Sequence, residues 1–315
     1  MQDYLLRIKK MKAQLPILEN ENFVASAGGT HYRVFLSKKY AIRFRDNNPK
    51  LLLREADFLK QLDHQLIPKI LWTGKVGRST VMVENRLLGK NLNLIWKSLP
   101  MANQRHIIKQ VIQFLQYLKT QTKNYVYSVN TGKKYDGFLA CLTDTINQKI
   151  TKIKQFKQTG KIIEDLLAII NIPGGKRLFS KKEKIILVHG DLITHNLLTD
   201  GKNLTGVLDW ELALFGDPDY DLFRLFYYQE CAKAYQKQGI DETFEADYMD
   251  KLVTAILGSD LIENNKLFWK KYQFVHAIFH LNALDWAANS NNPEENFNEL
   301  ITQWNKKSRV KQKAA

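Results

Sequence analysis

The first ninety residues alternate short apolar runs with polar turns, which is the pattern of an antiparallel sheet. The strand-like runs lie at residues 23–36, 40–43, 66–71 and 80–83. Two other stretches, residues 1–15 and 51–62, repeat their apolar side chains at helical spacing instead. The pattern therefore predicts a small strand-rich unit that carries two helices.

Beyond residue 100 the apolar positions recur mostly every three or four residues, as they do in amphipathic helices. The predicted helices span residues 101–119, 137–156, 161–172, 220–237, 244–257 and 266–288. Two short apolar runs of strand type, residues 185–188 and 204–208, interrupt them. We therefore expect an α+β fold in which a small antiparallel-sheet lobe precedes a larger, mainly helical lobe.

The composition is that of a folded globular enzyme. The chain has 315 residues, of which 44% are hydrophobic, so it can bury a substantial core. No apolar run approaches the ~20 residues of a membrane span, and the first residues lack the apolar core of a secretion signal. Cys141 and Cys231 stand ninety residues apart without a Cys/His cluster, which argues against a disulfide framework or a zinc site. We expect a cytoplasmic protein that does not bind membranes.

The net charge of +15 is unevenly distributed. Residues 1–210 hold 35 lysines and arginines against 16 acids, whereas residues 211–315 hold 12 against 16. A basic half suggests phosphate-rich partners. No RNA-binding signature accompanies the charge, so a lysine-rich surface on a nucleotide-binding enzyme is the simpler interpretation.

Candidate chemistry gathers between residues 184 and 223. The apolar run 185–188 ends at His189-Gly190-Asp191, Asn196 follows, and the run 204–208 ends at Asp209. Such spacing lets one carboxylate meet an acceptor hydroxyl while an amide oxygen and a second carboxylate hold Mg²⁺ on nucleotide phosphates. The stretch therefore predicts phosphoryl transfer.

The three motifs of this stretch, HGDLxxxNLL, VLDWE and GDPxxDL, together resemble the aminoglycoside phosphotransferase family. Its wider superfamily includes choline, homoserine, fructosamine and methylthioribose kinases. The sequence has HGD where protein kinases have HRD, and Asp209-Trp210-Glu211 where they have Asp-Phe-Gly. The resemblance implies a bilobal protein-kinase-like fold, with a nucleotide-binding lobe at residues 1–86 and a helical lobe with the catalytic loop and acceptor site at residues 87–315.

The resemblance also implies roles for individual residues. Asp191 would act as the catalytic base toward the acceptor hydroxyl, and Asn196 and Asp209 would hold Mg²⁺. His189 would brace the catalytic loop through hydrogen bonds. Asp217 and Asp221 would hold that loop from beneath, although their positions also suit a turn and a helix cap.

Nucleotide-binding residues are expected in the first lobe. A glycine-containing hairpin would cover the phosphates, Arg43 would contact the α and β phosphates, and Glu55 would fix Arg43 or else form an exposed ion pair of little energy. The segment 84–89 resembles the lobe connection whose backbone reads the base. The residues assigned to nucleotide binding are Ser26, Gly28, Gly29, Thr30, Arg43, Glu55, Glu84 and Arg86.

We therefore expect an ATP-dependent kinase, with GTP as the alternative donor and Mg²⁺ as cofactor. It would phosphorylate a hydroxyl of a small molecule, an aminoglycoside being one candidate, and act as a monomer or weak dimer without a nucleic-acid partner. One alternative is a protein or tRNA-associated kinase, but the Ala-Pro-Glu of protein kinases is absent. The other is a non-catalytic nucleotide- or RNA-binding protein, which the complete set of catalytic carboxylates opposes.

Two further hypotheses concern the second half of the chain. Acidic residues after Asp209 would attract a cationic acceptor if they face a cleft, or else are scattered surface residues; they are Glu211, Glu230, Asp285, Glu294 and Glu295. His276 and His280 stand four apart, as metal ligands on a helix do, but no third ligand is evident, so we expect ordinary helix packing.

Overall fold

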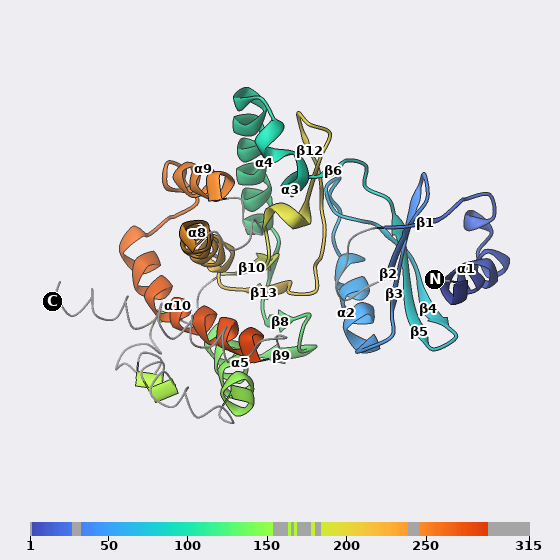
Figure 1. Ribbon diagram of the computed structural model, residues 1–315. Helices are drawn as coiled ribbons and strands as arrows, with labels where there is room; N and C mark the ends of the chain where they lie inside the picture. The colour runs from blue at the N-terminus through green and yellow to red at the C-terminus, as the bar shows by residue number, and fades with distance from the viewer. Residues whose placement is uncertain are drawn as a thin grey trace.

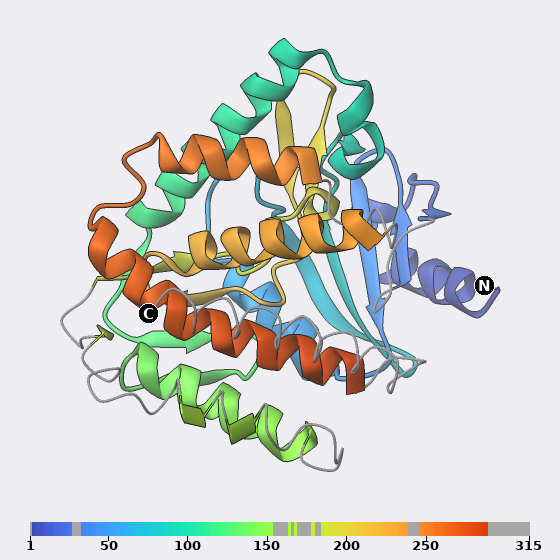
Figure 2. The ribbon, with the colours of Figure 1, turned by 60° about the vertical axis from the view of Figure 1, so that its left-hand side comes forward.

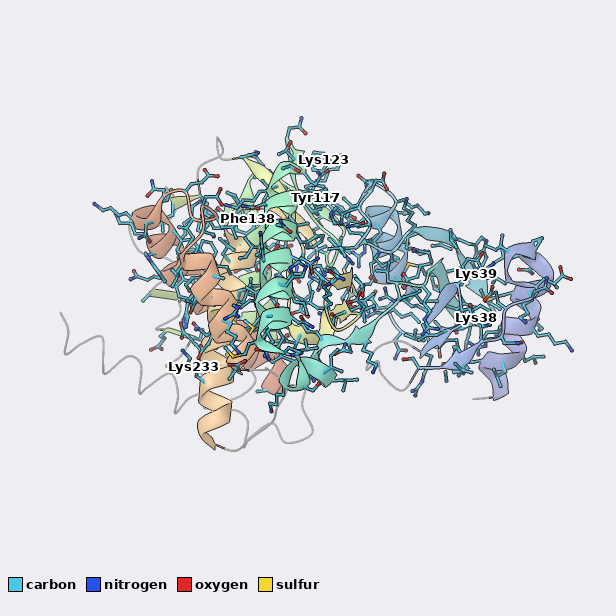
Figure 3. The ribbon with its side chains drawn as sticks, turned by 90° about the horizontal axis from the view of Figure 1, so that it is seen from above. Lys38, Lys39, Tyr117, Lys123, Phe138 and Lys233 are labelled. Carbon is cyan, nitrogen blue, oxygen red and sulfur yellow. The ribbon has the colours of Figure 1, made fainter. Side chains whose placement is uncertain are left out.

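A computed structural model describes residues 2–26, 33–153, 163–164, 167–168, 178–179, 184–238 and 246–288. This part of the chain forms a smaller lobe built on an antiparallel sheet and a larger lobe that is mainly helical (Figure 1). Seen from above, Lys38 and Lys39 lie in the smaller lobe, whereas Tyr117, Lys123, Phe138 and Lys233 lie in the larger one (Figure 3). The α+β fold expected from the periodicity is confirmed.

The sheet of the smaller lobe has the strand order β1-β2-β3-β5-β4, and every pairing is antiparallel. Its strands are β1 (Val24–Ala25), β2 (Arg33–Leu36), β3 (Tyr40–Arg45), β4 (Ile70–Val76) and β5 (Ser79–Asn85). The helices of this lobe are α1 (Gln2–Gln14), η1 (Pro16–Leu18) and α2 (Pro49–Leu59). Strand β5 thus lies between β3 and β4, and the five strands form one layer.

The two α-helices cover opposite faces of this sheet (Figure 1). Apolar side chains of α1 pack with Ile42 and Phe44 of β3 and with Val83 of β5. Helix α2 packs instead against Met82. Because side chains of a strand alternate between faces, Arg43, which pairs with Met82, lies on the α2 side of the sheet.

The larger lobe combines helices with two small sheets. Its helices are α3 (Leu92–Ile95), η2 (Trp96–Ser98), α4 (Met101–Thr120), α5 (Phe138–Ile153), η4 (Thr194–Asn196), α8 (Tyr220–Gln238), α9 (Ala246–Leu257) and α10 (Asn265–Ala288). One sheet has the order β7-β10-β13-β8-β9, with β7 (Thr122–Lys123), β8 (Val126–Ser128), β9 (Lys133–Tyr135), β10 (Ile185–Val188) and β13 (Leu214–Gly216). The other has the order β12-β11-β6, with β6 (Lys90–Asn91), β11 (Leu197–Thr199) and β12 (Leu204–Val207).

Helices α9, α8, α10 and α5 run side by side across this lobe (Figure 2). Their inner faces join a continuous core that includes the fully buried Trp96, Phe114, Trp210, Phe223 and Phe268. Burial of such aromatic side chains is the main source of stability here, since each removes a large apolar area from water. No helix in the described ranges is long and apolar enough to cross a bilayer.

Most predicted elements are present, and two need comment. The strand expected at residues 66–71 begins only at Ile70, because Pro68 has no N–H for a sheet and the Leu66 carbonyl accepts a hydrogen bond from Val207 N at 2.8 Å instead. The helix expected at residues 161–172 falls almost entirely outside the described residues.

Candidate active site

The predicted catalytic loop begins at the end of the buried strand β10 and ends in the hairpin of β11 and β12. Leu197 pairs with Val207 in that hairpin, and Leu208 N donates to the Asn196 carbonyl at 2.8 Å. The same pairing that closes the hairpin therefore brings Asn196 beside the residue preceding Asp209. The two predicted metal ligands, Asn196 and Asp209, therefore lie at the same end of the hairpin, although the whole hairpin separates them in the sequence.

Asp221, at the start of α8, holds the loop from beneath as predicted. Its carboxylate accepts hydrogen bonds from His189 N at 2.9 Å and Gly190 N at 2.7 Å. Burial raises the pKa of Asp221 to about 6, although these two donors act in the opposite direction. Gly190 has φ +83°, and a Cβ there would lie 2.6 Å from the Leu212 carbonyl, so the loop requires glycine at this position.

The prediction for Asp217 was wrong. Its carboxylate accepts from Lys271 Nζ of α10 at 2.8 Å and from Asp219 N at 3.0 Å, and neither donor belongs to the catalytic loop. Both members of the Lys271–Asp217 pair are buried. The reason is the tight turn before α8, which directs Asp217 toward α10 while Asp221, one helical turn later, faces the loop.

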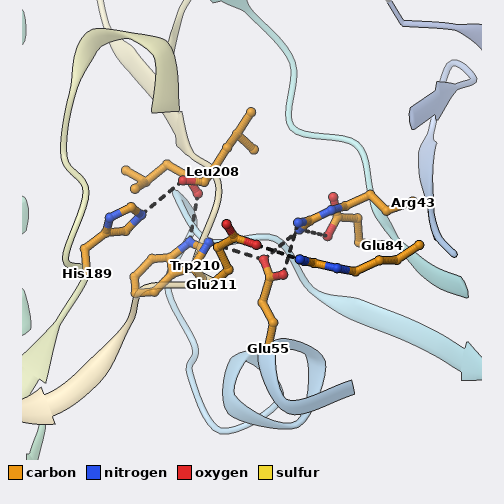
Figure 4. A network of polar contacts seen from close by, with 9 residues as sticks. Arg43, Glu55, Glu84, His189, Leu208, Trp210 and Glu211 are labelled. Atoms are coloured by element: carbon orange, nitrogen blue, oxygen red, sulfur yellow. Dashed lines mark hydrogen bonds and ion pairs between the residues drawn. The ribbon is translucent and has the colours of Figure 1, made fainter. Parts of the chain in front are cut away.

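His189 braces the loop through both ring nitrogens. Its Nδ1 accepts from Asp191 N at 3.1 Å, so Nε2 carries the hydrogen and donates to the Leu208 carbonyl at 3.0 Å (Figure 4). The ring lies edge-on to Trp210, with 4.5 Å between centroids. Burial lowers the pKa of His189 to about 4, so the ring is neutral and suited to bracing rather than to proton transfer.

Both carboxylate oxygens of Asp191 have donors. Asn196 Nδ2 donates to Oδ2 at 2.8 Å and to the Asp191 carbonyl at 2.9 Å. Tyr228 OH donates to Oδ1 at 2.6 Å, and Arg224 Nη2 lies 3.4 Å from the same oxygen. The sequence analysis missed Tyr228 and Arg224, because both come from α8 and only their one-turn spacing after GDPxxDL hinted at a shared face.

Asp209 and Asn196 suit a hard cation. The Asp209 backbone has φ +63°, and its Oδ1 is buried without a hydrogen-bond partner among the described residues. Burial raises the pKa of Asp209 to about 7 even though Arg43 opposes this. Because the Asn196 amide nitrogen turns toward Asp191, its oxygen is the atom left for a ligand. These two oxygens fit Mg²⁺, which takes its remaining ligands from phosphate and water.

Arg43 and Glu55 form a buried bidentate pair. Nη1 to Oε1 is 2.7 Å and Nη2 to Oε2 is 3.0 Å, and the Glu55 side chain is 0% exposed. The predicted pairing is thus confirmed, and the exposed-pair alternative is wrong. Glu55 Oε1 also accepts from Trp210 N at 3.2 Å, so α2 is tied to the turn that carries Asp209 (Figure 4).

A second ion pair ties the same turn to the smaller lobe. Arg45 Nη1 of β3 lies 2.9 Å from Glu211 Oε2. Glu211 follows Asp209 by two residues, so the turn is held at Trp210 and at Glu211 by groups of the other lobe. The position of Asp209 therefore depends on the way the lobes contact each other.

The remaining predicted nucleotide-binding residues that the structure describes do not form one cluster with the Arg43–Glu55 pair, apart from Glu84. Glu84 is buried 4.0 Å from Arg43, and burial raises its pKa to about 7. Arg86 donates from its side chain to the Ser37 carbonyl at 2.6 Å and so braces the turn between β2 and β3. Ser26 N bonds the Val34 carbonyl at 2.8 Å, which closes the base of the hairpin. Gly28, Gly29 and Thr30 lie outside the described residues.

Two asparagines after the lobe connection hold the catalytic loop from its other side. Asn91 Nδ2 donates to the His195 carbonyl at 2.5 Å, and Thr194 Oγ1 lies 3.1 Å from Asn93 Oδ1. Asn91 also caps α3 by accepting from Asn93 N at 3.0 Å. Nothing in their local sequence distinguishes them from ordinary turn asparagines, so they too were missed.

The acids of the predicted acceptor surface that the structure describes each contact a neighbouring side chain. Glu211 pairs with Arg45, and Asp285 pairs with Lys149, so cations already neutralise both. Glu230 accepts from Tyr272 OH at 2.6 Å and lies 3.2 Å from His276 Nε2. Glu294 and Glu295 lie outside the described residues. In the described ranges no three His, Cys, Asp or Glu side chains gather into a metal site.

The buried Arg43–Glu55 pair leads to a stability prediction. Glu55→Gln should lower the free energy of unfolding by about 3 kcal/mol or more, because it leaves the Arg43 charge buried without its partner. Urea denaturation measures the change. Asp57→Asn is the matched control, since Asp57 lies on the same helix but its pair with Lys60 is exposed and should contribute less than about 1 kcal/mol. Equal effects of the two substitutions would contradict the importance of the buried pair.

Comparisons with known proteins identify the family. The sequence profile of the "Phosphotransferase enzyme family" matches residues 19–250. Hygromycin-B 4-O-kinase of Escherichia coli is 36% identical over 52 residues, which span 16% of this chain and 15% of that enzyme. This alignment thus covers only a small part of the relative's length.

Solved structures share the fold over nearly the whole chain. A thermostable mutant of aminoglycoside phosphotransferase APH(4)-Ia, in a ternary complex with AMP-PNP and hygromycin B, has a TM-score of 0.66 at 14% identity and covers 92% of this chain and 97% of its own. ADP-bound APH(2'')-Ib has a TM-score of 0.64 at 14% identity and covers 94% and 96%. At such identities the likeness establishes the bilobal kinase-like fold alone.

Proposed function

The chain belongs to the phosphotransferase enzyme family, and from this premise we propose that it transfers the γ-phosphate of ATP to a hydroxyl of a small molecule. One observation carries the proposal most. Asn196 Nδ2 donates to the Asp191 carboxylate, and the Asn196 carbonyl accepts from Leu208 N, next to Asp209, whose buried Oδ1 has no hydrogen-bond partner among the described residues. This arrangement offers a base for an alcohol and oxygen ligands for a phosphate-bound cation within one loop system.

In the proposed reaction the acceptor hydroxyl binds Asp191 and its oxygen attacks the γ-phosphorus in line. The new O–P bond forms as the bond from phosphorus to the β,γ-bridging oxygen breaks, and Asp191 accepts or orients the departing proton. Asn196 and Asp209 would hold Mg²⁺, which would neutralise charge on the phosphates. Neutral His189 and buried Asp221 keep the loop backbone fixed throughout.

We further propose that the smaller lobe, residues 1–86, binds the nucleotide. Glu55 orients Arg43 toward the α and β phosphates, and the hairpin that includes Ser26 covers them. The backbone of residues 84–89 contacts the base, with ATP as donor and GTP as the alternative. Arg86 contributes indirectly, because its guanidinium donates to the Ser37 carbonyl and so braces the neighbouring turn.

For the acceptor we propose a hydroxylated small molecule, with aminoglycosides as the first class to test. The support comes from the ligands bound in similar structures, among them hygromycin B and streptomycin. Surface charge adds little support, since Glu211, Glu230 and Asp285 each contact a neighbouring side chain. The acceptor must therefore be found by experiment.

Incubation with ATP, Mg²⁺ and a pool of aminoglycosides and amino alcohols tests the proposal. We expect ADP formation that depends on one compound, with that compound gaining one phosphoryl group by mass spectrometry. The Asp191→Asn variant is the control for contaminating kinases. Phosphate appearing instead on added protein or tRNA would contradict the small-molecule assignment, and failure to bind ATP would contradict the kinase assignment altogether.

A further inference from the structure

Two side chains of helix α8, Tyr228 and Arg224, contact the carboxylate of Asp191 from outside the catalytic loop. Tyr228 OH donates to Asp191 Oδ1 at 2.6 Å. Arg224, one helical turn earlier, donates from Nη2 to the Tyr228 hydroxyl, and the same nitrogen lies 3.4 Å from Asp191 Oδ1. The three groups form a short relay from guanidinium to phenol to carboxylate.

We infer that Arg224 and Tyr228 are positioning residues for Asp191: the guanidinium polarises the phenol, and the phenol fixes the carboxylate plane in which the acceptor hydroxyl must bind. The inference rests on the proposed function of Asp191. It adds two residues that the motifs did not identify.

The relay is fixed to the catalytic loop by the start of α8. Asp221, in the first turn of that helix, accepts the backbone hydrogen bonds of His189 and Gly190. Residues 224 and 228 follow on the same face at intervals of three and four. Helix α8 therefore fixes the loop backbone through Asp221. It also positions Tyr228, which orients the Asp191 side chain.

Arg224 is held firmly enough to act in this way. Its guanidinium carbon lies 5.2 Å from the centre of the Tyr228 ring and 5.5 Å from that of Phe279 on α10, so the cation packs over two aromatic rings. Burial alone would lower the pKa of Arg224, but Tyr228 and Asp191 raise it, so the guanidinium stays charged. A charged donor makes the phenol a stronger donor to Asp191.

The relay also completes the restraint of Asp191. Asn196 Nδ2 holds Oδ2 at 2.8 Å, and Tyr228 holds Oδ1. With a donor on each oxygen, the Asp191 carboxylate cannot rotate freely. Its remaining lone pairs therefore point in a fixed direction, toward which the acceptor hydroxyl can bind. Correct orientation of a reacting group matters greatly, since a misplacement of about 1 Å can cost roughly 100-fold in rate.

We expect Tyr228→Phe to lower kcat by about 10- to 100-fold while leaving the KM for ATP nearly unchanged, because the lost hydroxyl acts on Asp191 and not on the nucleotide. Tyr248→Phe is the matched control. The Tyr248 hydroxyl is also buried but has no hydrogen-bond partner among the described residues, so its removal should leave kcat unchanged. ADP formation from ATP and Mg²⁺ with water as acceptor supplies the rate before the true acceptor is known.

A double-mutant cycle separates positioning from a merely structural effect. If Tyr228 acts through Asp191, the double variant Asp191→Ala with Tyr228→Phe should be no slower than Asp191→Ala alone. Additive losses, a wild-type kcat for Tyr228→Phe, or a raised KM for ATP would each overturn the inference. An active Asp191→Ala enzyme would instead overturn the proposed function.

A second variant keeps the test decisive if Tyr228→Phe unfolds. Arg224→Lys retains the charge and should keep more turnover than Arg224→Met, provided that both melt within a few degrees of the wild type. Equal rates for these two variants would show that the charge does not act on the relay, which would overturn the inference.

Discussion

The Asp191→Ala variant is expected to lose about 10²- to 10⁴-fold in kcat while binding Mg²⁺·ATP almost as the wild type does. The lost carboxylate, which we propose to face the acceptor hydroxyl, accepts hydrogen bonds from Asn196 and Tyr228. Asp209 and the Arg43–Glu55 pair, which we propose to serve the nucleotide, stay in place. The loss should therefore fall on turnover rather than on the KM for ATP.

Steady-state kinetics and calorimetric titration with an ATP analogue measure the two quantities separately. Asp191→Asn provides the isosteric control, because the amide keeps the volume of the side chain but cannot accept the proton. A variant that retained more than a tenth of wild-type turnover would have lost only about 1.4 kcal/mol of barrier reduction. In that case Asp191 is not the base.

Asp209→Asn should lose both nucleotide binding and turnover. Asparagine tolerates the left-handed backbone at φ +63°, so the change removes the charge without straining the turn. We expect the affinity for Mg²⁺·ATP to fall by at least about 10- to 100-fold, as for other substitutions that weaken metal sites. Binding of ATP in the presence of EDTA should change little, since the carboxylate acts through the cation.

The same variant should be more stable than the wild type when no metal or nucleotide is bound. Burial raises the pKa of Asp209 to about 7, which means that the folded protein disfavours its charged form. Removing the charge relieves this cost, so Asp209→Asn should unfold at a higher urea concentration. A gain in stability accompanied by a loss of activity is typical of groups kept for function. A destabilised variant that still bound Mg²⁺·ATP would contradict the assignment.

Local features of the chain were predictable because they depend on near neighbours. The helices at residues 101–119, 220–237 and 266–288 follow from apolar spacing, and the structure has them within a few residues. His189, Asp191 and Asn196 are likewise close in the sequence, so their place on one loop could be predicted. Boundaries were less reliable, as the late start of β4 after Pro68 shows, since a strand also needs a partner for its backbone.

The sequence by itself thus determined the two-lobed α+β fold, the family resemblance and the loop on which the chemistry is proposed to lie. Only the tertiary structure decided which distant groups serve that loop. Tyr228 reaches Asp191 across 37 residues, Trp210 N reaches Glu55 across 155, and Arg45 reaches Glu211 across 166. The physical reason is that periodicity and spacing report a residue's own helix or strand. The partner of a charge depends instead on how whole elements pack together, so Asp217, bound to Lys271, resembled Asp221 in the sequence but not in the fold.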